Sequence, residues 1–95
     1  MKVRWALQAK QDRADILTHI AADNVPAAIA MDELFGAAAG RLVDFPLRGR
    51  HRMVPGTRQL VVHESYRLIY EVDESEGVVW LLALIHTARR WPPRH

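Results

Sequence analysis

Residues 58–86 read RQLVVHESYRLIYEVDESEGVVWLLALIH, three largely apolar stretches separated by two polar turns. The stretches cover 58–63, 66–72 and 78–86. Strand-like runs separated by two to five turn residues are typical of β-hairpins. This segment therefore predicts three consecutive antiparallel strands.

Alternation within these strands predicts which side chains share a face, because successive residues of a strand point to opposite sides of the sheet. In 66–72 one face would carry Tyr66, Leu68, Tyr70 and Val72, and the other Arg67, Ile69 and Glu71. The stretch 78–86 is apolar at both sets of positions, which is typical of a central strand covered on both faces. We expect helices to cover one face, and the loop and the tail, or a partner, to cover the other.

The N-terminal half predicts one short strand and a helical pair. Apolar residues alternate with polar ones over 2–7, which favours an edge strand, and the period then becomes helical from about Ala9 to near Ala22. A second helix is expected to begin at about Val25, since Asp23-Asn24 offers a cap and Pro26 suits a first helical turn. Its predicted apolar face consists of Ala28, Met31, Phe35, Ala38, Ala39 and Leu42.

The remaining segments are predicted to be irregular. Residues 43–56 lack a period and contain two prolines and two glycines, which favours a loop, and the prolines after His86 exclude a further strand. Together these features predict a single α+β domain over 1–95. An N-terminal antiparallel helical hairpin would pack on one face of a small, mainly antiparallel β-sheet.

Composition narrows the possible chemistry. The chain has 95 residues and no cysteine, which excludes disulfides, thiolate zinc sites and a cysteine nucleophile. A domain of this size buries only about 60% of the surface that its unfolded chain exposes, so a site should be shallow. The charged start, MKVRWALQAKQDRAD, and the absence of a long apolar run predict a cytoplasmic protein that does not bind membranes.

Positive charge is concentrated in two basic segments. Residues 41–58 contain five arginines and one acid, and residues 86–95 contain three arginines, two histidines and no acid. Arginine binds phosphate and carboxylate groups through its planar fork of donors. Ordinary solvated arginines, or docking of an acidic partner, would explain the same pattern.

The candidate functional residues are arginines, histidines and tyrosines of the predicted sheet and the loops beside it. They are Arg48, Arg50, Arg52, Arg58, His63, Tyr66, Arg67, Tyr70, His86, Arg89 and Arg90, with Trp91 in the tail. Arginines could bind phosphates, and a histidine or tyrosine could transfer protons in RNA cleavage. By default, Tyr66 and Tyr70 are packing residues at the edge of the core.

Other common sites lack their residue patterns. The histidines show no metal-ligand spacing beside a carboxylate, the glycines do not form a phosphate-binding loop, and the two serines fall in predicted turns. We therefore expect no metal, no cofactor and no small-molecule substrate.

Two long strings resemble the RelE/ParE superfamily of bacterial toxins from type II toxin-antitoxin systems. PGTRQLVVHESYRLIYEV (55–72) matches the family's G-x-R turn and Y-R-L-x-Y strand, and LIHTARRWP (84–92) matches its H-x-x-R-R-x-P ending. The resemblance covers most of the chain. It implies the α+β fold described above and a cognate antitoxin, a small protein encoded alongside, whose C-terminal segment wraps over the toxin.

The superfamily contains toxins with two different targets. RelE-like toxins cleave mRNA on the ribosome, and in them an arginine of the Y-R-L-x-Y motif and a later arginine stabilise the phosphate. Arg67 matches the first, and Arg89 or Arg90 the second. The lysines that RelE-like toxins carry on the preceding strand are missing here, where that strand reads Leu-Val-Val at 60–62, although His63 and His86 could substitute.

ParE-like toxins instead poison DNA gyrase and need no catalytic residues. The compact segment 56–70 and the H-x-x-R-R-x-P ending are closer to this group. We therefore favour gyrase as the target, with ribosome-bound mRNA as the alternative. Residues expected to contact the target or the antitoxin are Arg48, Arg50, Arg52, Arg58, Tyr66, Tyr70 and Trp91, while Arg67, His63, His86, Arg89 and Arg90 would be catalytic only in a RelE-like enzyme.

Overall fold

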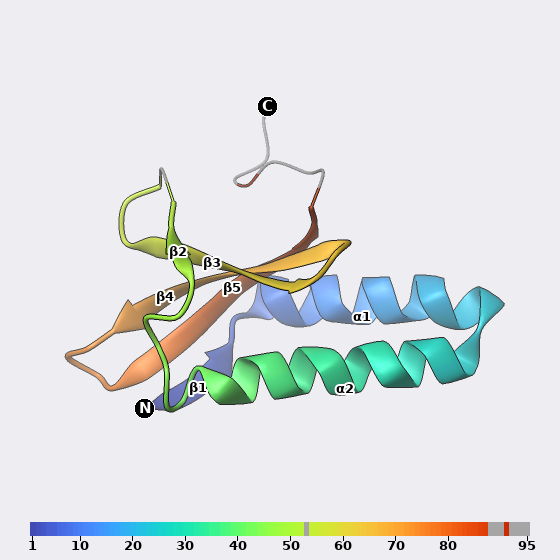
Figure 1. Ribbon diagram of the computed structural model, residues 1–95, viewed down its shortest axis with the longest axis horizontal. Helices are drawn as coiled ribbons and strands as arrows, with labels where there is room; N and C mark the ends of the chain where they lie inside the picture. Colours follow the sequence, from blue (N-terminus) through green and yellow to red (C-terminus); the bar gives the residue numbers. More distant parts are fainter. Residues whose placement is uncertain (53, 88–90, 92–95) are drawn as a thin grey trace.

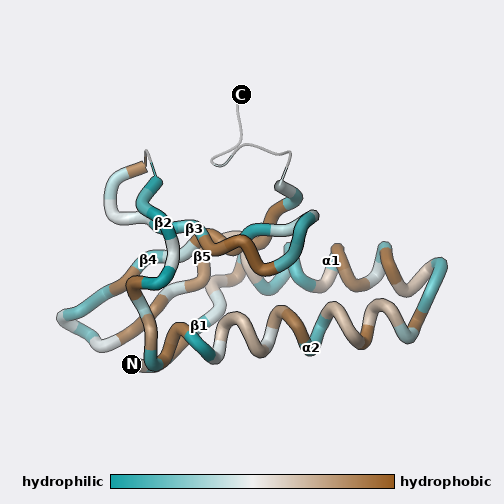
Figure 2. Tube along the Cα trace, in the orientation of Figure 1, coloured by the Kyte–Doolittle hydropathy of each residue, from teal (hydrophilic) through white to brown (hydrophobic). Residues whose placement is uncertain are grey.

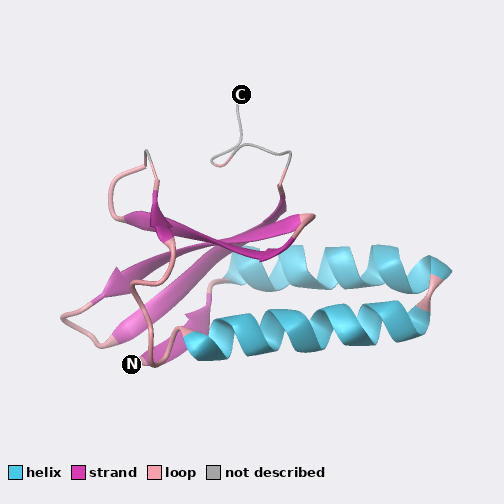
Figure 3. Cartoon of the chain, viewed as in Figure 1, coloured by secondary structure: helices cyan, strands magenta, loops and turns pink. Residues whose placement is uncertain are grey.

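The structure, a computed structural model, describes residues 1–52, 54–87 and 91 and has the predicted α+β architecture (Figures 1 and 3). Its elements are β1 (Lys2–Trp5), α1 (Leu7–Asp23), α2 (Val25–Arg41), β2 (Arg50–His51), β3 (Thr57–His63), β4 (Tyr66–Asp73) and β5 (Val78–His86). The five strands form one sheet in the order β1-β5-β4-β3-β2. The β1–β5 pair is parallel and the other three pairs are antiparallel, so the prediction of a mainly antiparallel sheet is confirmed.

The helical hairpin is formed by the residues that predicted it. Asn24 separates the two helices: its side-chain oxygen accepts a hydrogen bond from the Ala27 backbone amide at 3.0 Å, and its own amide donates to Ile20 at 2.9 Å. Proline in the first turn of α2 loses no hydrogen bond there. Arg13 of α1 then forms an ion pair with Asp32 of α2 at 2.7 Å. The helices therefore lie antiparallel against one face of the sheet.

The predicted N-terminal strand is too long, because Leu7 belongs to a helix. β1 pairs with β5 only from Lys2 to Trp5, and α1 begins at Leu7, whose side chain is 84% exposed. Farther along the edge of β5, the Leu84 amide donates to the Asp12 carboxylate of α1 at 3.0 Å. Helix α1 thus takes the position beside β5 that a longer β1 would need.

The predicted loop 43–56 contains a short strand that the sequence did not indicate. Arg50 and His51 pair with β3, opposite Gln59 and Arg58. Two residues are too few to produce a period, so only the pairing defines this strand. The neighbouring strands are also slightly longer than predicted, since β3 begins at Thr57 and β4 ends at Asp73.

A bulge in β5 changes which of its side chains face the helices. Ile69 of β4 pairs with Ala83 and Tyr70 pairs with Leu81, so Leu82 is the extra residue. The bulge shifts the alternation, and both Leu81 and Leu84 point to the helical side, where they are almost fully buried. Trp80, expected on a buried face, is only half-buried.

The core lies between the helical hairpin and the sheet (Figure 2). Its buried members are Ala9, Phe35, Ala39, Leu42, Leu68, Tyr70, Val79, Leu81 and Leu84. The opposite face, which we call the open face, has no helix over it in the described chain. Ile69 and Ala83 are nevertheless buried there, so other groups must cover them.

Candidate functional site

Two arginines meet at one glutamine on the open face. Arg67 of β4 donates from Nη1 to the Gln59 side-chain oxygen at 3.0 Å, and Arg52, which follows β2, donates to the same oxygen at 2.5 Å. Gln59 pairs with Ile69, which in turn pairs with Ala83. Long arginine side chains can cover apolar surface with their methylene groups while presenting the guanidinium outward. The two guanidinium groups therefore meet at Gln59, beside the buried Ile69–Ala83 row.

Trp91 completes this group. Arg52 donates from Nη2 to the Trp91 carbonyl oxygen at 2.6 Å, and its guanidinium lies 5.9 Å from the centre of the indole ring. A cation over an aromatic face at this distance is attracted by the ring. Residues from the segment after β2, from β3, from β4 and from the tail are thus joined, and we call Arg52, Gln59, Arg67 and Trp91 the arginine cluster. Arg52 from the loop and Trp91 from the tail thus meet at the open face.

The electrostatics of the arginine cluster favour an anion. Burial, and then the positive charge of Arg67, lower the pKa of Arg52. The group remains a cation at neutral pH, because guanidinium does not deprotonate in proteins. Its Nε atom is buried without a hydrogen-bond partner among the described residues. A carboxylate or phosphate beside the guanidinium groups of Arg52 and Arg67 would offset their positive charge and could accept hydrogen bonds from such donors.

Arg58 and Tyr70 hold the loop that precedes β2. Arg58 donates from Nη1 to the Gly49 carbonyl at 2.8 Å, and the Tyr70 hydroxyl accepts a hydrogen bond from the Gly49 amide at 2.7 Å. Tyr70 is fully buried in the core, so its expected contact with a partner is wrong. Burial raises the pKa of its hydroxyl despite the Gly49 hydrogen bond. Its role is structural, in agreement with the packing alternative.

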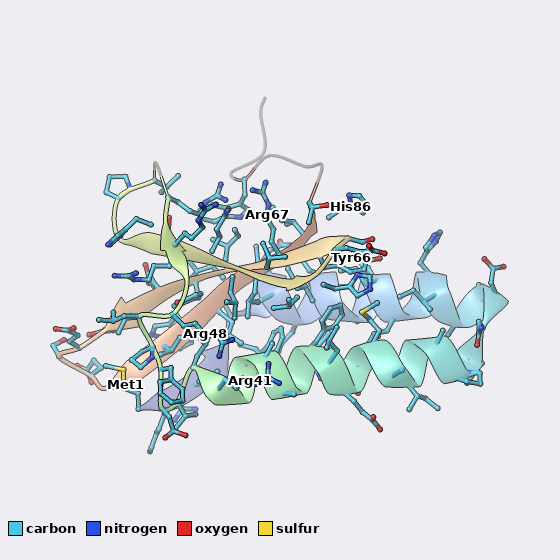
Figure 4. All side chains as sticks on the ribbon, viewed as in Figure 1. Met1, Arg41, Arg48, Tyr66, Arg67 and His86 are labelled. Carbon is cyan, nitrogen blue, oxygen red and sulfur yellow. The ribbon has the colours of Figure 1, made fainter. Side chains whose placement is uncertain are left out.

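Two predicted histidines, His63 and His86, lie beside Tyr66. The His63 and His86 rings are 6.0 and 5.8 Å from the Tyr66 ring, and Tyr66 packs edge-on against Phe35 of α2 at 5.7 Å. Arg67 is in the next row of the sheet, where it pairs with Val61 and Ile85. Consecutive strand residues point to opposite faces, so Arg67 is on the open face and Tyr66 on the helical side (Figure 4).

Tyr66 and His86 line a hollow of about 550 Å³ between the end of the sheet and α1. Asp12, Asp15 and His19 of α1 lie on its other side. Among residues 1–52, 54–87 and 91, no group of three histidine or acidic side chains could hold a metal ion. Neither helix of the described chain is long and apolar enough to span a membrane.

The other candidates are distributed around these groups. Arg48 and Arg50 have exposed side chains on the loop and on β2. Arg89 and Arg90 lie outside the described residues. Sequence reasoning missed Gln59, because a single glutamine between Arg58 and Leu60 has no distinctive pattern.

The chain is similar in sequence to known proteins. The profile of a family described as "ParE toxin of type II toxin-antitoxin system, parDE" matches residues 3–91. A protein of Sinorhizobium fredii named "Putative toxin Y4kP" is 28% identical over 92 residues, which are 96% of this chain and 93% of that protein.

Solved toxin structures have the same fold. A chain of the chromosomal ParDE system of P. aeruginosa superposes with a TM-score of 0.77 at 21% identity, over 90% of this chain and 95% of that one. For the RelBE2 toxin-antitoxin complex of Mycobacterium tuberculosis the TM-score is 0.62 at 27% identity, with the same coverage of 90% and 95%. For the isolated E. coli RelE toxin it is 0.60 at 13% identity, over 95% of this chain and 87% of that one.

The family match covers nearly all of the chain, and the fold and the motifs agree with it. The chain therefore belongs to the family of ParE toxins of type II toxin-antitoxin systems, within the RelE/ParE superfamily.

Proposed function

We propose that this toxin inhibits growth in the cytoplasm by binding DNA gyrase, and that a cognate antitoxin holds it inactive. The family match to ParE toxins supports gyrase as the target. The similarity to chains from ParDE and RelBE2 toxin-antitoxin systems supports a protein antitoxin. In this proposal the chain acts by binding and catalyses no reaction.

The contacts of Arg67 and of the two histidines support the choice of target: Arg67 donates to Gln59, whereas the rings of His63 and His86 lie beside Tyr66. Cleavage of RNA through its 2′-hydroxyl requires a base and an acid within hydrogen-bond reach of the reacting phosphate. The side chain that both Arg52 and Arg67 contact is Gln59, whose amide does not transfer protons. The histidines pack around Tyr66 on the helical side of the sheet. This arrangement suits binding of an anionic group better than its cleavage.

Ribosome-dependent mRNA cleavage is the second candidate function. Arg52 and Arg67 could together bind a phosphate, and Arg67 occupies the position of the motif arginine. The likeness to the RelBE2 complex, at 27% identity, also favours this function. Arg67 would then stabilise the charge on the phosphate during reaction.

Two assays on the purified toxin test the target. We expect inhibition of gyrase supercoiling at toxin concentrations that leave mRNA intact on translating ribosomes. Adding the antitoxin should relieve the inhibition. Cleavage of ribosome-bound mRNA with no effect on gyrase would overturn the proposal in favour of the RelE-like function.

Two variants extend the test to residues. In a gyrase inhibitor, Arg67→Ala should reduce toxicity less than truncation of the chain after Ala88, because the resemblance to ParE-like toxins points to the C-terminal region. In an RNA-cleaving enzyme, Arg67→Ala should instead lower the cleavage rate by about 10² to 10³. Arg4→Ala, which removes an exposed arginine on β1, controls for a general loss of positive charge. Circular dichroism should confirm that each variant folds.

A further inference from the structure

Four exposed apolar side chains gather around the loop that follows α2: Met1, Val43, Phe45 and Leu47. The side chains of Phe45 and Leu47 are 62% and 58% exposed, and together with Pro46 they line one shallow hollow. The N-terminal ammonium group donates to the Val43 carbonyl at 3.3 Å, which brings Met1 beside them. We call these four residues the apolar loop surface. Such a patch on a small protein usually marks an interaction site.

Hydrogen bonds fix the backbone that presents this surface. The Phe45 amide donates to Arg41 at 2.9 Å, and the Arg48 amide donates to Phe45 at 3.2 Å. From the neighbouring strand, Arg58 donates to the Leu47 carbonyl at 3.3 Å. An aromatic side chain on a backbone that is already ordered loses little conformational entropy on binding. The loop is therefore built to hold Phe45 outward.

The charges around the apolar loop surface are mainly positive. Arg41 and Arg48 flank it with exposed side chains (Figure 4), and Asp44, which lines the same hollow as Phe45, is the one acid within 41–58. Near Met1, Lys2 and Arg4 accompany Asp73 and Glu76. An apolar centre with a cationic rim is complementary to an acidic segment that carries large apolar side chains. A second copy of this chain would bring arginines against arginines, so charge disfavours self-association.

We propose that the apolar loop surface docks an acidic, apolar segment of the antitoxin, with Phe45 and Leu47 as the anchoring side chains. The inference rests on the proposed function, which supplies the antitoxin, and adds where that partner binds. The surface lies at the end of α2 on the helical side of the sheet, whereas Arg67 projects from the open face (Figure 4). The antitoxin can thus be recognised at a place separate from the arginine cluster.

The test measures binding of the purified toxin to the antitoxin encoded by the adjacent reading frame, by isothermal titration calorimetry. The double variant Phe45→Ser/Leu47→Ser should weaken the affinity by roughly 30-fold or more, as loss of central anchors does. Val25→Ser/Ile29→Ser is the matched control, because these side chains on α2 are 57% and 56% exposed. It should bind like the wild type.

A charge variant tests the rim. Arg41→Gln/Arg48→Gln should lower the association rate and flatten its dependence on salt, since both side chains are exposed. Thermal melts of all variants should be nearly unchanged, which excludes unfolding as the cause of weaker binding.

The outcomes separate this inference from the proposed function. Wild-type affinity in the Phe45→Ser/Leu47→Ser variant would overturn the docking site and leave the toxin proposal intact. No binding of the wild-type chain to the antitoxin would overturn both. Unchanged antitoxin binding with loss of gyrase inhibition would assign the surface to the target. A dimer in sedimentation velocity that the double variant abolishes would assign it to a second copy of the chain.

Discussion

The two faces of the sheet are stabilised by different interactions. On the helical side, Leu68, Leu81 and Phe35 are buried in a continuous apolar core. On the open face, Arg67 and Arg52 share the side-chain oxygen of Gln59. Adjacent residues of β4 thus contribute to entirely different environments.

Because the two faces of the sheet differ in this way, so small a chain can have both a core and a binding surface. Packing of the helical hairpin on one face supplies the apolar burial on which stability depends. The open face is then available for polar groups that a tightly packed core would not tolerate. We therefore expect substitutions of buried core residues on the helical side to change stability and substitutions on the open face to change binding.

The largest effect is expected at Phe35. Phe35→Ala should lower the free energy of unfolding by about 3 to 5 kcal/mol, because the side chain is 1% exposed and packs against Tyr66. Trp80→Ala should cost less, since Trp80 is only half-buried and lies outside the core cluster. Urea unfolding measures both. Equal losses of unfolding free energy in the two variants would show that the two faces are packed alike.

Gly49 connects the loop that precedes β2 to the core through its hydrogen bond to Tyr70. An added Cβ would lie 2.6 Å from the Tyr70 hydroxyl and 2.7 Å from the Gln59 carbonyl, so one of these groups must move. Gly49→Ala should therefore destabilise the fold by roughly 1 to 3 kcal/mol, the usual cost of overpacking. Thermal denaturation measures the loss, and Gly40→Ala, where nothing lies within 4 Å of the added carbon, is the control.

Tyr70 should make the fold sensitive to alkali. Burial raises the pKa of its hydroxyl above the ordinary 10.0, so the folded state retains a proton that the unfolded state loses, and stability should fall as the pH rises above about 10. Tyr70→Phe should remove this contribution to the slope. At neutral pH it should cost about 1 kcal/mol, because the Gly49 amide loses its acceptor. Identical alkaline slopes for the two proteins would contradict the prediction.

The smallest effect is expected at Val61 on the open face. Val61 lies in β3 opposite Arg67 of β4, and its side chain is 60% exposed. Val61→Thr should therefore change the free energy of unfolding by less than about 0.5 kcal/mol. Urea unfolding of this variant in parallel with Phe35→Ala gives the sharpest contrast between the faces. A loss above 1 kcal/mol would mean that the open face also supports the fold.

Predictions from local features of the sequence were reliable. Asn24 is a helix cap because its side chain reaches the Ala27 amide three residues away, an interaction that depends on neighbouring residues alone. The three strands between 57 and 86 follow from alternation and short turns, which are equally local. Leu7 was assigned wrongly because it fits a strand pattern as well as it fits an exposed position in a helix.

Contacts between distant residues were not predictable in this way. The bulge at Leu82 lies in a stretch that is apolar at both sets of positions, and β2 has only two residues, so neither produces a recognisable pattern in the sequence. Tyr70 and Arg67 are both polar-tipped residues of one strand, and only the fold shows that the first is buried against Gly49. Gln59 received no role because an isolated glutamine has no distinctive pattern.

By itself, the sequence determined the α+β class, the helical hairpin, the three-stranded segment and the membership of the toxin superfamily, because these depend on periodicity, capping and contiguous motifs. Only the tertiary structure decided which polar residues meet. It placed Arg52 beside Arg67 and Trp91 but His63 and His86 around Tyr66, on the other side of the sheet. The physical reason is that register, bulges and chain crossings fix the face of each side chain, and these are set by packing across the whole sheet.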